Sequence, residues 1–145
     1  AQPASNVVLT ITSSDTGEAT VTSSLTFTNA NWNSAQTVTV TGVDDNIIDG
    51  TITSNITIAV LDETSDNAFD SLSNQTVSVT TTDNDVAGFT IAQSGGSTTV
   101  AETGTTDTFT IVLNAQPNSD VVLSITSGDT GEATVTSALT FTAAN

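Results

Sequence analysis

The chain has 145 residues, of which 16 are acidic, and it contains no Lys, Arg or His, so its formal net charge is −16. A chain without basic residues cannot replace the counterions of a polyanion, and this excludes nucleic acid and anionic membrane surfaces as partners. The lack of His, Cys, Lys and Tyr excludes the usual nucleophile–base pairs, so the sequence predicts a protein that is not an enzyme.

Threonine alternates with Val, Ile, Leu or Phe along most of the chain, beginning with Val7, Leu9 and Ile11. A period of two residues places the apolar side chains on one face, which is typical of half-buried strands. In chain order, the same pattern predicts further strands around residues 25–27, 38–40, 56–60, 77–79, 89–91 and 109–113. Because these strands are short and are separated by turn residues, the sequence predicts an all-β protein with an antiparallel, immunoglobulin-like β-sandwich.

An internal repeat is the strongest signal in the sequence. Residues 2–31 and 116–145 are identical at 24 of 30 positions, without a gap, at an offset of 114 residues. A repeat of this length is too long for a solenoid and has the size of one domain. We therefore expect a tandem array read out of phase, with 1–85 as the C-terminal portion of one repeat and 86–145 as the N-terminal portion of the next.

The ends of the chain and its middle carry further expectations. The chain has no Met, so residue 1 is not expected to be a translation start, and no apolar run approaches the roughly 20 residues of a membrane span. Residues 86–115 are expected to pair in one of two ways. They would either begin the second repeat or fold back to supply the opening strands of the first.

Acidic turns are the candidate functional sites, and they lie at Asp44-Asp45-Asn46, Asp49-Gly50 and Asp83-Asn84-Asp85. Calcium binds six to eight oxygen atoms from carboxylates, carbonyls and water, and such turns supply these atoms at short reach. Two carboxylates about 4 Å apart repel each other by roughly 4 kcal/mol at an effective dielectric constant near 20. Since the chain has no basic residue, converging acidic turns predict a bound divalent cation. In the alternative interpretation, Asp and Asn are only turn-forming and solubilising residues.

That alternative is preferred for the acidic residues of the two D-T-G-E turns, which are Asp15, Glu18, Asp129 and Glu132. It is also preferred for the acidic stretch 62–70, whose spacing is not that of an EF-hand, although a second ion site is an alternative there. Trp32 directly follows a predicted strand and is interpreted as a core or edge anchor. A platform for stacking a sugar is the alternative for this residue.

Several short motifs resemble those of the Calx-β repeat, an immunoglobulin-like sandwich of sodium–calcium exchangers, integrin β4 and giant bacterial adhesins. Val100-Ala101-Glu102-Thr103-Gly104 resembles its early V-x-E-x-G turn, and residues 25–27 and 36–40 resemble its L-x-F and t-x-x-V strands. Residues 43–50 resemble its D-D-x-x-x-E-G loop, with Asp49 in place of the usual Glu, and residues 82–85 resemble its closing t-D-x-D.

The resemblance implies that acidic loops at one end of the sandwich hold Ca²⁺. It would make five residues calcium ligands of the first repeat and one a ligand of the second, namely Asp44, Asp45, Asp49, Asp83 and Asp85, and Glu102. The family usually has another acid soon after the D-D-x-x-x-E-G loop, whereas Thr51, Ile52 and Thr53 follow here. One or two ions are therefore expected rather than a larger cluster.

Three functions compete at this stage. The first is a calcium-stiffened extender repeat of a large adhesin, located outside the cell on a bacterial surface, whose partners are the neighbouring repeats and whose tip binds an unidentified ligand. The second is a subunit of an extracellular homopolymer or surface layer that is completed by strand exchange. The third is a carbohydrate-binding module, and a content of one Trp and five Phe counts against it.

Overall fold

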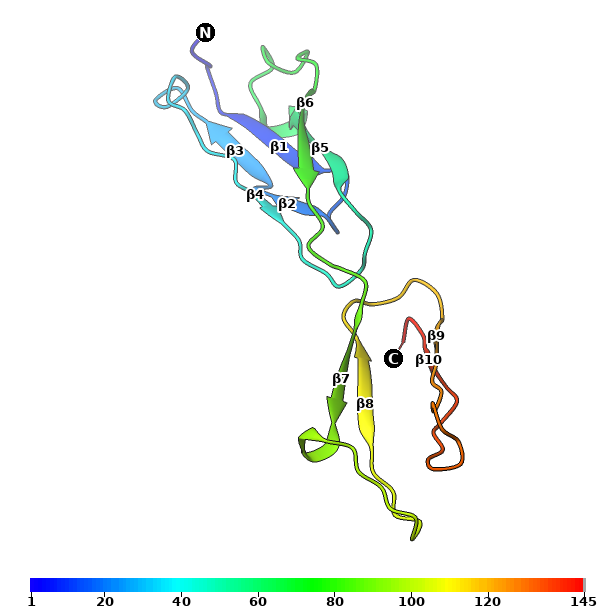
Figure 1. Ribbon diagram of the computed structural model, residues 1–145. Helices are drawn as coiled ribbons and strands as arrows, with labels where there is room; N and C mark the ends of the chain where they lie inside the picture. The colour runs from blue at the N-terminus through cyan, green and yellow to red at the C-terminus, as the bar shows by residue number, and fades with distance from the viewer. Residues whose placement is uncertain (145) are drawn as a thin grey trace. The chain divides into compact units, whose positions relative to one another are not determined.

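The computed structural model describes residues 1–144, and these residues form only β-strands, two 3-10 turns and loops (Figure 1). All strand pairs are antiparallel, which confirms the predicted all-β antiparallel class. The strands are β1 (Val7–Ser13), β2 (Ala19–Val21), β3 (Ser24–Phe27), β4 (Val40–Gly42), β5 (Ile52–Val60), β6 (Gln75–Thr81), β7 (Phe89–Gln93), β8 (Phe109–Leu113), β9 (Val121–Ser124) and β10 (Ala138–Phe141). The 3-10 turns are η1 (Asp62–Thr64) and η2 (Ser94–Gly96).

The chain divides into two compact units. The first unit comprises residues 1–45 and 50–83, and it contains a four-stranded sheet in the order β3-β1-β5-β6 together with the pair β2-β4. The second unit comprises residues 46–49 and 84–145, and it contains the pairs β7-β8 and β9-β10. Within the described residues, no helix is long and apolar enough to cross a membrane.

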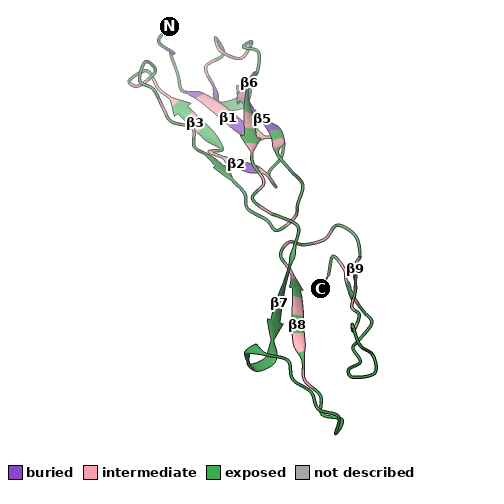
Figure 2. Cartoon of the chain, in the orientation of Figure 1, coloured by how far each residue is buried: buried purple, intermediate pink, exposed green. Residues whose placement is uncertain are grey.

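The core of the first unit lies where β1 and β5 pair, as the burial colours of Figure 2 show. Ile11 and Ile56 are each only 2% exposed, Val7 is 5% exposed and Ala19 is fully buried. Ile11 lies opposite Ile58 across the two strands, so apolar residues that alternate with Thr in the sequence meet on one face of the sheet. The alternation therefore identified the central strands correctly.

The strand predicted around residues 38–40 is shorter than expected and begins only at Val40. Thr39 donates its backbone N–H to the hydroxyl of Thr22 at 3.1 Å, whereas Thr22 donates its own N–H to the carbonyl of Thr39 at 3.0 Å. A side-chain oxygen thus replaces a backbone carbonyl at the end of the β2–β4 ladder, and the regular pairing stops there. The partner strand β2 had not been predicted.

Residues 86–115 were expected either to begin the second repeat or to complete the first, and within the described residues they pair with no strand of the first unit and group with the residues after them in the second unit. Within the described residues, β7 and β8 pair only with each other, in a register that places Ile91 opposite Ile111. The sheets are small and separate, so the architecture is all-β and antiparallel without a demonstrated sandwich.

Candidate metal centre

Glu18 lies in the turn that connects β1 to β2. Asp15 shapes this turn, because its Oδ1 accepts the N–H of Gly17 at 3.0 Å and its carbonyl accepts the N–H of Ala19 at 3.1 Å. The carbonyl of Glu18 then accepts the N–H of Val43 at 2.8 Å, directly after the β2–β4 pair of Ala19 and Gly42. The register of this short ladder therefore places Glu18 opposite the start of the loop 43–50.

The loop 43–50 is held at its other end by an acidic side chain. Gly50 donates its backbone N–H to Oδ2 of Asp83 at 2.9 Å. Gly50 has a φ of +78°, a left-handed conformation that an L side chain adopts only at a cost. A glycine at this position therefore adopts, without strain, the backbone conformation that directly follows Asp49.

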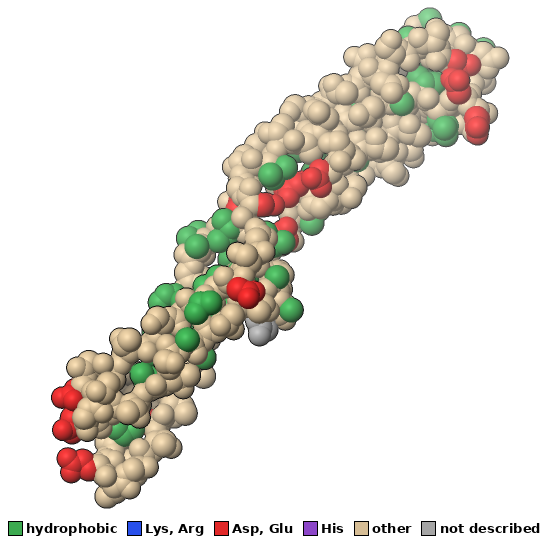
Figure 3. Space-filling view, turned by 90° about the vertical axis from the view of Figure 1, so that its right-hand side faces the viewer, with side chains coloured by type: hydrophobic (Ala, Val, Ile, Leu, Met, Phe, Trp, Pro, Cys, Tyr) green, Lys and Arg blue, Asp and Glu red, His purple; other side chains and the backbone are tan. Residues whose placement is uncertain are grey.

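This arrangement brings Glu18, Asp45 and Asp49 together. One carboxylate oxygen from each residue lies within 4.8 Å of the other two. Glu18 is half-buried and the two aspartates are exposed, so water reaches the group. The space-filling view in Figure 3 shows acidic side chains in several separate groups on the visible face and no basic side chain.

The chemistry of the group fits a hard divalent cation. Three carboxylate oxygens would supply about half of the oxygens that Ca²⁺ requires, and carbonyls or water would supply the others. A magnesium ion would need more regular octahedral geometry. Exposed acidic groups of this kind also occur without a metal, so the grouping identifies a candidate site whose occupancy has to be measured.

Two of the three residues in this group had been predicted as metal ligands from the sequence. Asp45 and Asp49 were both predicted as ligands, whereas Glu18 had been interpreted as a solubilising turn residue. The sequence shows Glu18 as an acidic residue three positions after Asp15 in a tight turn. Only the β2–β4 register places this turn opposite the start of the loop 43–50.

The other predicted ligands lie outside the group of three. Asp83 accepts the hydrogen bond from Gly50, and Asp44 is exposed beside Asp45. Within the second unit, Glu102 is exposed and lines a cavity of about 540 Å³ together with Asp107 and Glu132. Within the described residues, neither these predicted ligands nor Asp85 join an acidic group of three, so their roles as ligands stay predictions.

The carboxylate of Asp107 accepts hydrogen bonds from two backbone N–H groups. It accepts the N–H of Thr99 at 2.9 Å and the N–H of Thr108 at 2.7 Å. These two hydrogen bonds lower the pKa of Asp107 below its ordinary value, and they outweigh the opposing effect of desolvation. Asp107 therefore connects two stretches of the loop between β7 and β8.

The acidic stretch 62–70 also uses one carboxylate to organise the backbone. Asp66 accepts the N–H groups of Ala4 at 2.6 Å, Ser5 at 3.1 Å and Ala68 at 3.0 Å. These bonds lower the pKa of Asp66, the bond from Ala68 most strongly. Desolvation raises the pKa of Asp70, with smaller contributions from neighbouring aspartates. The preferred interpretation of this stretch as a loop agrees with the structure, in which Asp66 binds the backbone N–H groups of residues 4 and 5.

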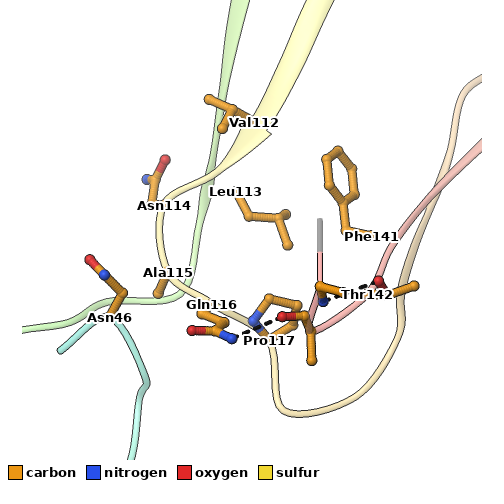
Figure 4. Close-up of a pocket in the computed structure, with 11 residues that line it drawn as sticks. Asn46, Val112, Leu113, Asn114, Ala115, Gln116, Pro117, Phe141 and Thr142 are labelled. Atoms are coloured by element: carbon orange, nitrogen blue, oxygen red, sulfur yellow. Dashed lines mark hydrogen bonds between the residues drawn. The ribbon is translucent and has the colours of Figure 1, made fainter.

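Two further cavities are each lined by residues of a single unit. Trp32, which is 40% exposed, lines a cavity of about 340 Å³ in the first unit together with Val7, Phe27 and other apolar residues. This setting agrees with an anchor, because a sugar site would also need polar partners. In the second unit, a cavity of about 390 Å³ is lined by residues such as Leu113 and Phe141, and Gln116 donates from Nε2 to the carbonyl of Ala143 at 2.9 Å (Figure 4).

Comparisons with protein-family models, with curated proteins and with solved structures found no match to this chain.

Proposed function

We propose that the chain is a calcium-binding structural repeat that extends a large secreted or cell-surface adhesin and has no catalytic activity. The observation that carries the proposal is the convergence of Glu18, Asp45 and Asp49 within 4.8 Å in a chain that has no Lys, Arg or His. The resemblance to the Calx-β repeat supports the same function, and it implies that the small sheets belong to an immunoglobulin-like sandwich.

Electrostatics is the physical reason for a cation at this site. At 4.8 Å in the dielectric of water, each pair of carboxylates repels by about 1 kcal/mol or less after screening. This repulsion is too small to unfold the unit, but no basic residue of the chain can offset it. A divalent ion would attract all three carboxylates, and these attractions would outweigh the three mutual repulsions. The ion would also link the β1–β2 turn to the loop 43–50.

Such a link suits a repeat whose task is mechanical. The loop is already anchored at Val43 by the carbonyl of Glu18 and at Gly50 by Asp83, so an ion would stiffen it with little further ordering. An exposed three-carboxylate group is expected to bind in the range of extracellular calcium modules, roughly 10⁻⁴ to 10⁻³ M. Calcium concentrations of that order fit a location outside the cell.

The test is a calcium titration in which Trp32 reports on the first unit, since it is the only Trp in the chain. We expect calcium to raise the melting temperature seen by Trp32 and a chelator to lower it. Glu18→Gln and Asp45→Asn should each weaken calcium binding by about tenfold or more, which corresponds to about 1.4 kcal/mol.

The internal repeat supplies a matched control. Glu132 occupies the position of Glu18 in the second copy of the turn, and its neighbour Asp129 again accepts the N–H of Gly131 at 3.0 Å. Glu132→Gln removes the same charge from the same kind of turn and should leave the response of Trp32 to calcium unchanged. Equal effects of the two substitutions would show that net charge, rather than a site, causes the response. A wild-type melt that calcium does not change would refute the proposal.

A further inference from the structure

Two segments of the chain have the Asn-x-Thr pattern of an N-glycosylation acceptor, Asn55-Ile56-Thr57 and Asn74-Gln75-Thr76. Because the chain is rich in Thr and Ser, the pattern alone carries little weight. Its significance depends on where the fold places the two Asn side chains and the two Thr hydroxyls. Both segments belong to the first unit, where the first lies inside β5 and the second begins directly before β6.

The register of β5 and β6, which lie side by side in Figure 1, brings the two segments together. Thr57 lies opposite Thr76, and Asn55 lies opposite Ser78. Since alternate residues of a strand share a face, these four residues lie on one face of the sheet. Asn55 is two residues to one side of the Thr57–Thr76 pair, and Asn74 is two residues to the other side. Four residue rises, roughly 13 Å, therefore separate the two Asn along the strands and leave room for a sugar on each.

The Asn55 side of the sheet points away from the core of the first unit. Ser54 and Ile56 flank Asn55 and are 3% and 2% exposed, whereas Asn55 and Asn74 are exposed. The backbone of Asn55 is fixed, because its N–H donates to Oγ of Ser14 and its carbonyl accepts the N–H of Ser14, both at 2.9 Å. Within the described residues, neither Asn uses its side-chain amide in a hydrogen bond. Each amide can therefore carry a substituent without the loss of a contact.

This face also differs from the loops in charge. None of the 16 acidic residues lies in β1, β3, β5 or β6, so the four-stranded sheet is uncharged in a chain with a net charge of −16. The exposed residues of β5 and β6 on this face are Thr53, Asn55, Thr76, Ser78 and Thr80. Charge repulsion therefore protects the loops from contact with other molecules but does not protect this polar face. A bulky, hydrophilic glycan would supply that protection.

We propose that Asn55 and Asn74 are acceptors for N-linked carbohydrate and that the glycans cover the uncharged face of β5 and β6. The proposal rests on the export of the chain that the proposed function includes, but it does not rest on calcium binding. The donor is a sugar whose anomeric carbon is bound to a diphosphate carrier. Nδ2 of Asn forms a bond to this carbon, and the bond from the carbon to the diphosphate oxygen breaks. The carrier leaves with the electron pair, and a base of the transferase takes one amide proton.

The test is expression of the whole chain in a host that N-glycosylates its secreted proteins and in a host that does not. Intact-mass measurement should find two glycans per chain from the first host, both removed by peptide-N-glycosidase. The chain has no Lys or Arg, so a protease that cuts after acidic residues is used to locate them. Residues 50–62 and 71–83 are then separate peptides, each with one of the two acceptors.

Matched variants show whether the pattern directs the modification. Thr57→Ala should remove the glycan from Asn55 alone, and Thr76→Ala should remove it from Asn74 alone, whereas Thr57→Ser and Thr76→Ser should keep both glycans. Thr12→Ala is the control, because Thr12 lies opposite Thr57 on the same face but belongs to neither segment. Both glycans should remain in this variant.

The folded state supplies a second measurement. Because the two amides make no contact within the described residues, the Trp32 melt of the glycosylated chain should equal or exceed that of the unglycosylated chain. Glu18→Gln should leave both glycans in place, so a failed calcium site and a failed glycan site give different results.

The proposal is overturned by any of three results. These are an unmodified Asn55 or Asn74 in the glycosylating host, glycans that the two Thr→Ala variants leave in place, and a lower Trp32 melt for the glycosylated chain.

Discussion

The repeat allows one core substitution to be compared in two environments within the same chain. Ile11 and Ile125 occupy equivalent positions, but Ile11 is 2% exposed between β3 and β5 whereas Ile125 is half-buried beside β10 only. Ile11→Ala removes three buried carbon atoms and leaves a cavity, which typically costs 2–5 kcal/mol, and we expect about 3 kcal/mol. Ile125→Ala removes carbon atoms that water already contacts in part, so we expect a cost of about 1 kcal/mol or less for its own pair of strands and none for the first unit.

The assay is urea unfolding followed by the fluorescence of Trp32, the only Trp in the sequence. Ile11→Ala should lower the midpoint of this transition without changing its slope, and Ile125→Ala should leave it in place. Equal shifts, or a loss below about 1 kcal/mol for Ile11→Ala, would show that β5 does not bury Ile11 as the structure indicates.

Two other predictions concern Asp66 and Gly50. Asp66→Asn should lower the melting temperature at neutral pH, because the hydrogen bonds from Ala4, Ser5 and Ala68 lower the pKa of the folded carboxyl below 3.8. A lowered pKa stabilises the fold above the unfolded value and this stability is lost as pH falls through the folded value, so melts of wild type and variant should converge below about pH 4. Gly50→Ala meets no atom within 4 Å but imposes an L side chain at a φ of +78°, so it should cost about 1 kcal/mol in a thermal melt with or without calcium, and no loss would refute the backbone conformation.

Local sequence patterns predicted the strands and showed that no basic residue can offset the repulsion between carboxylates. The alternation of Thr with apolar residues predicted β1 and β5 because the period of a strand is a property of consecutive residues. The lack of basic residues was equally visible, and it made any convergence of carboxylates significant before their positions were known. The internal repeat predicted a tandem array, and its two copies have the same register in their first strand pair.

Only the tertiary structure decided which acidic residues meet and which strand edges lack a partner. Glu18 joins Asp45 because a ladder of three residue pairs aligns β2 with β4, and neither the short β2 strand nor its register could be predicted from periodicity. The two copies of the repeat illustrate the same point, since Ile11 and Ile125 have nearly identical local sequences, but within the described residues only the strand of Ile11 pairs with β5. Pairing between distant segments depends on where the chain returns in space, and a local pattern does not contain that information.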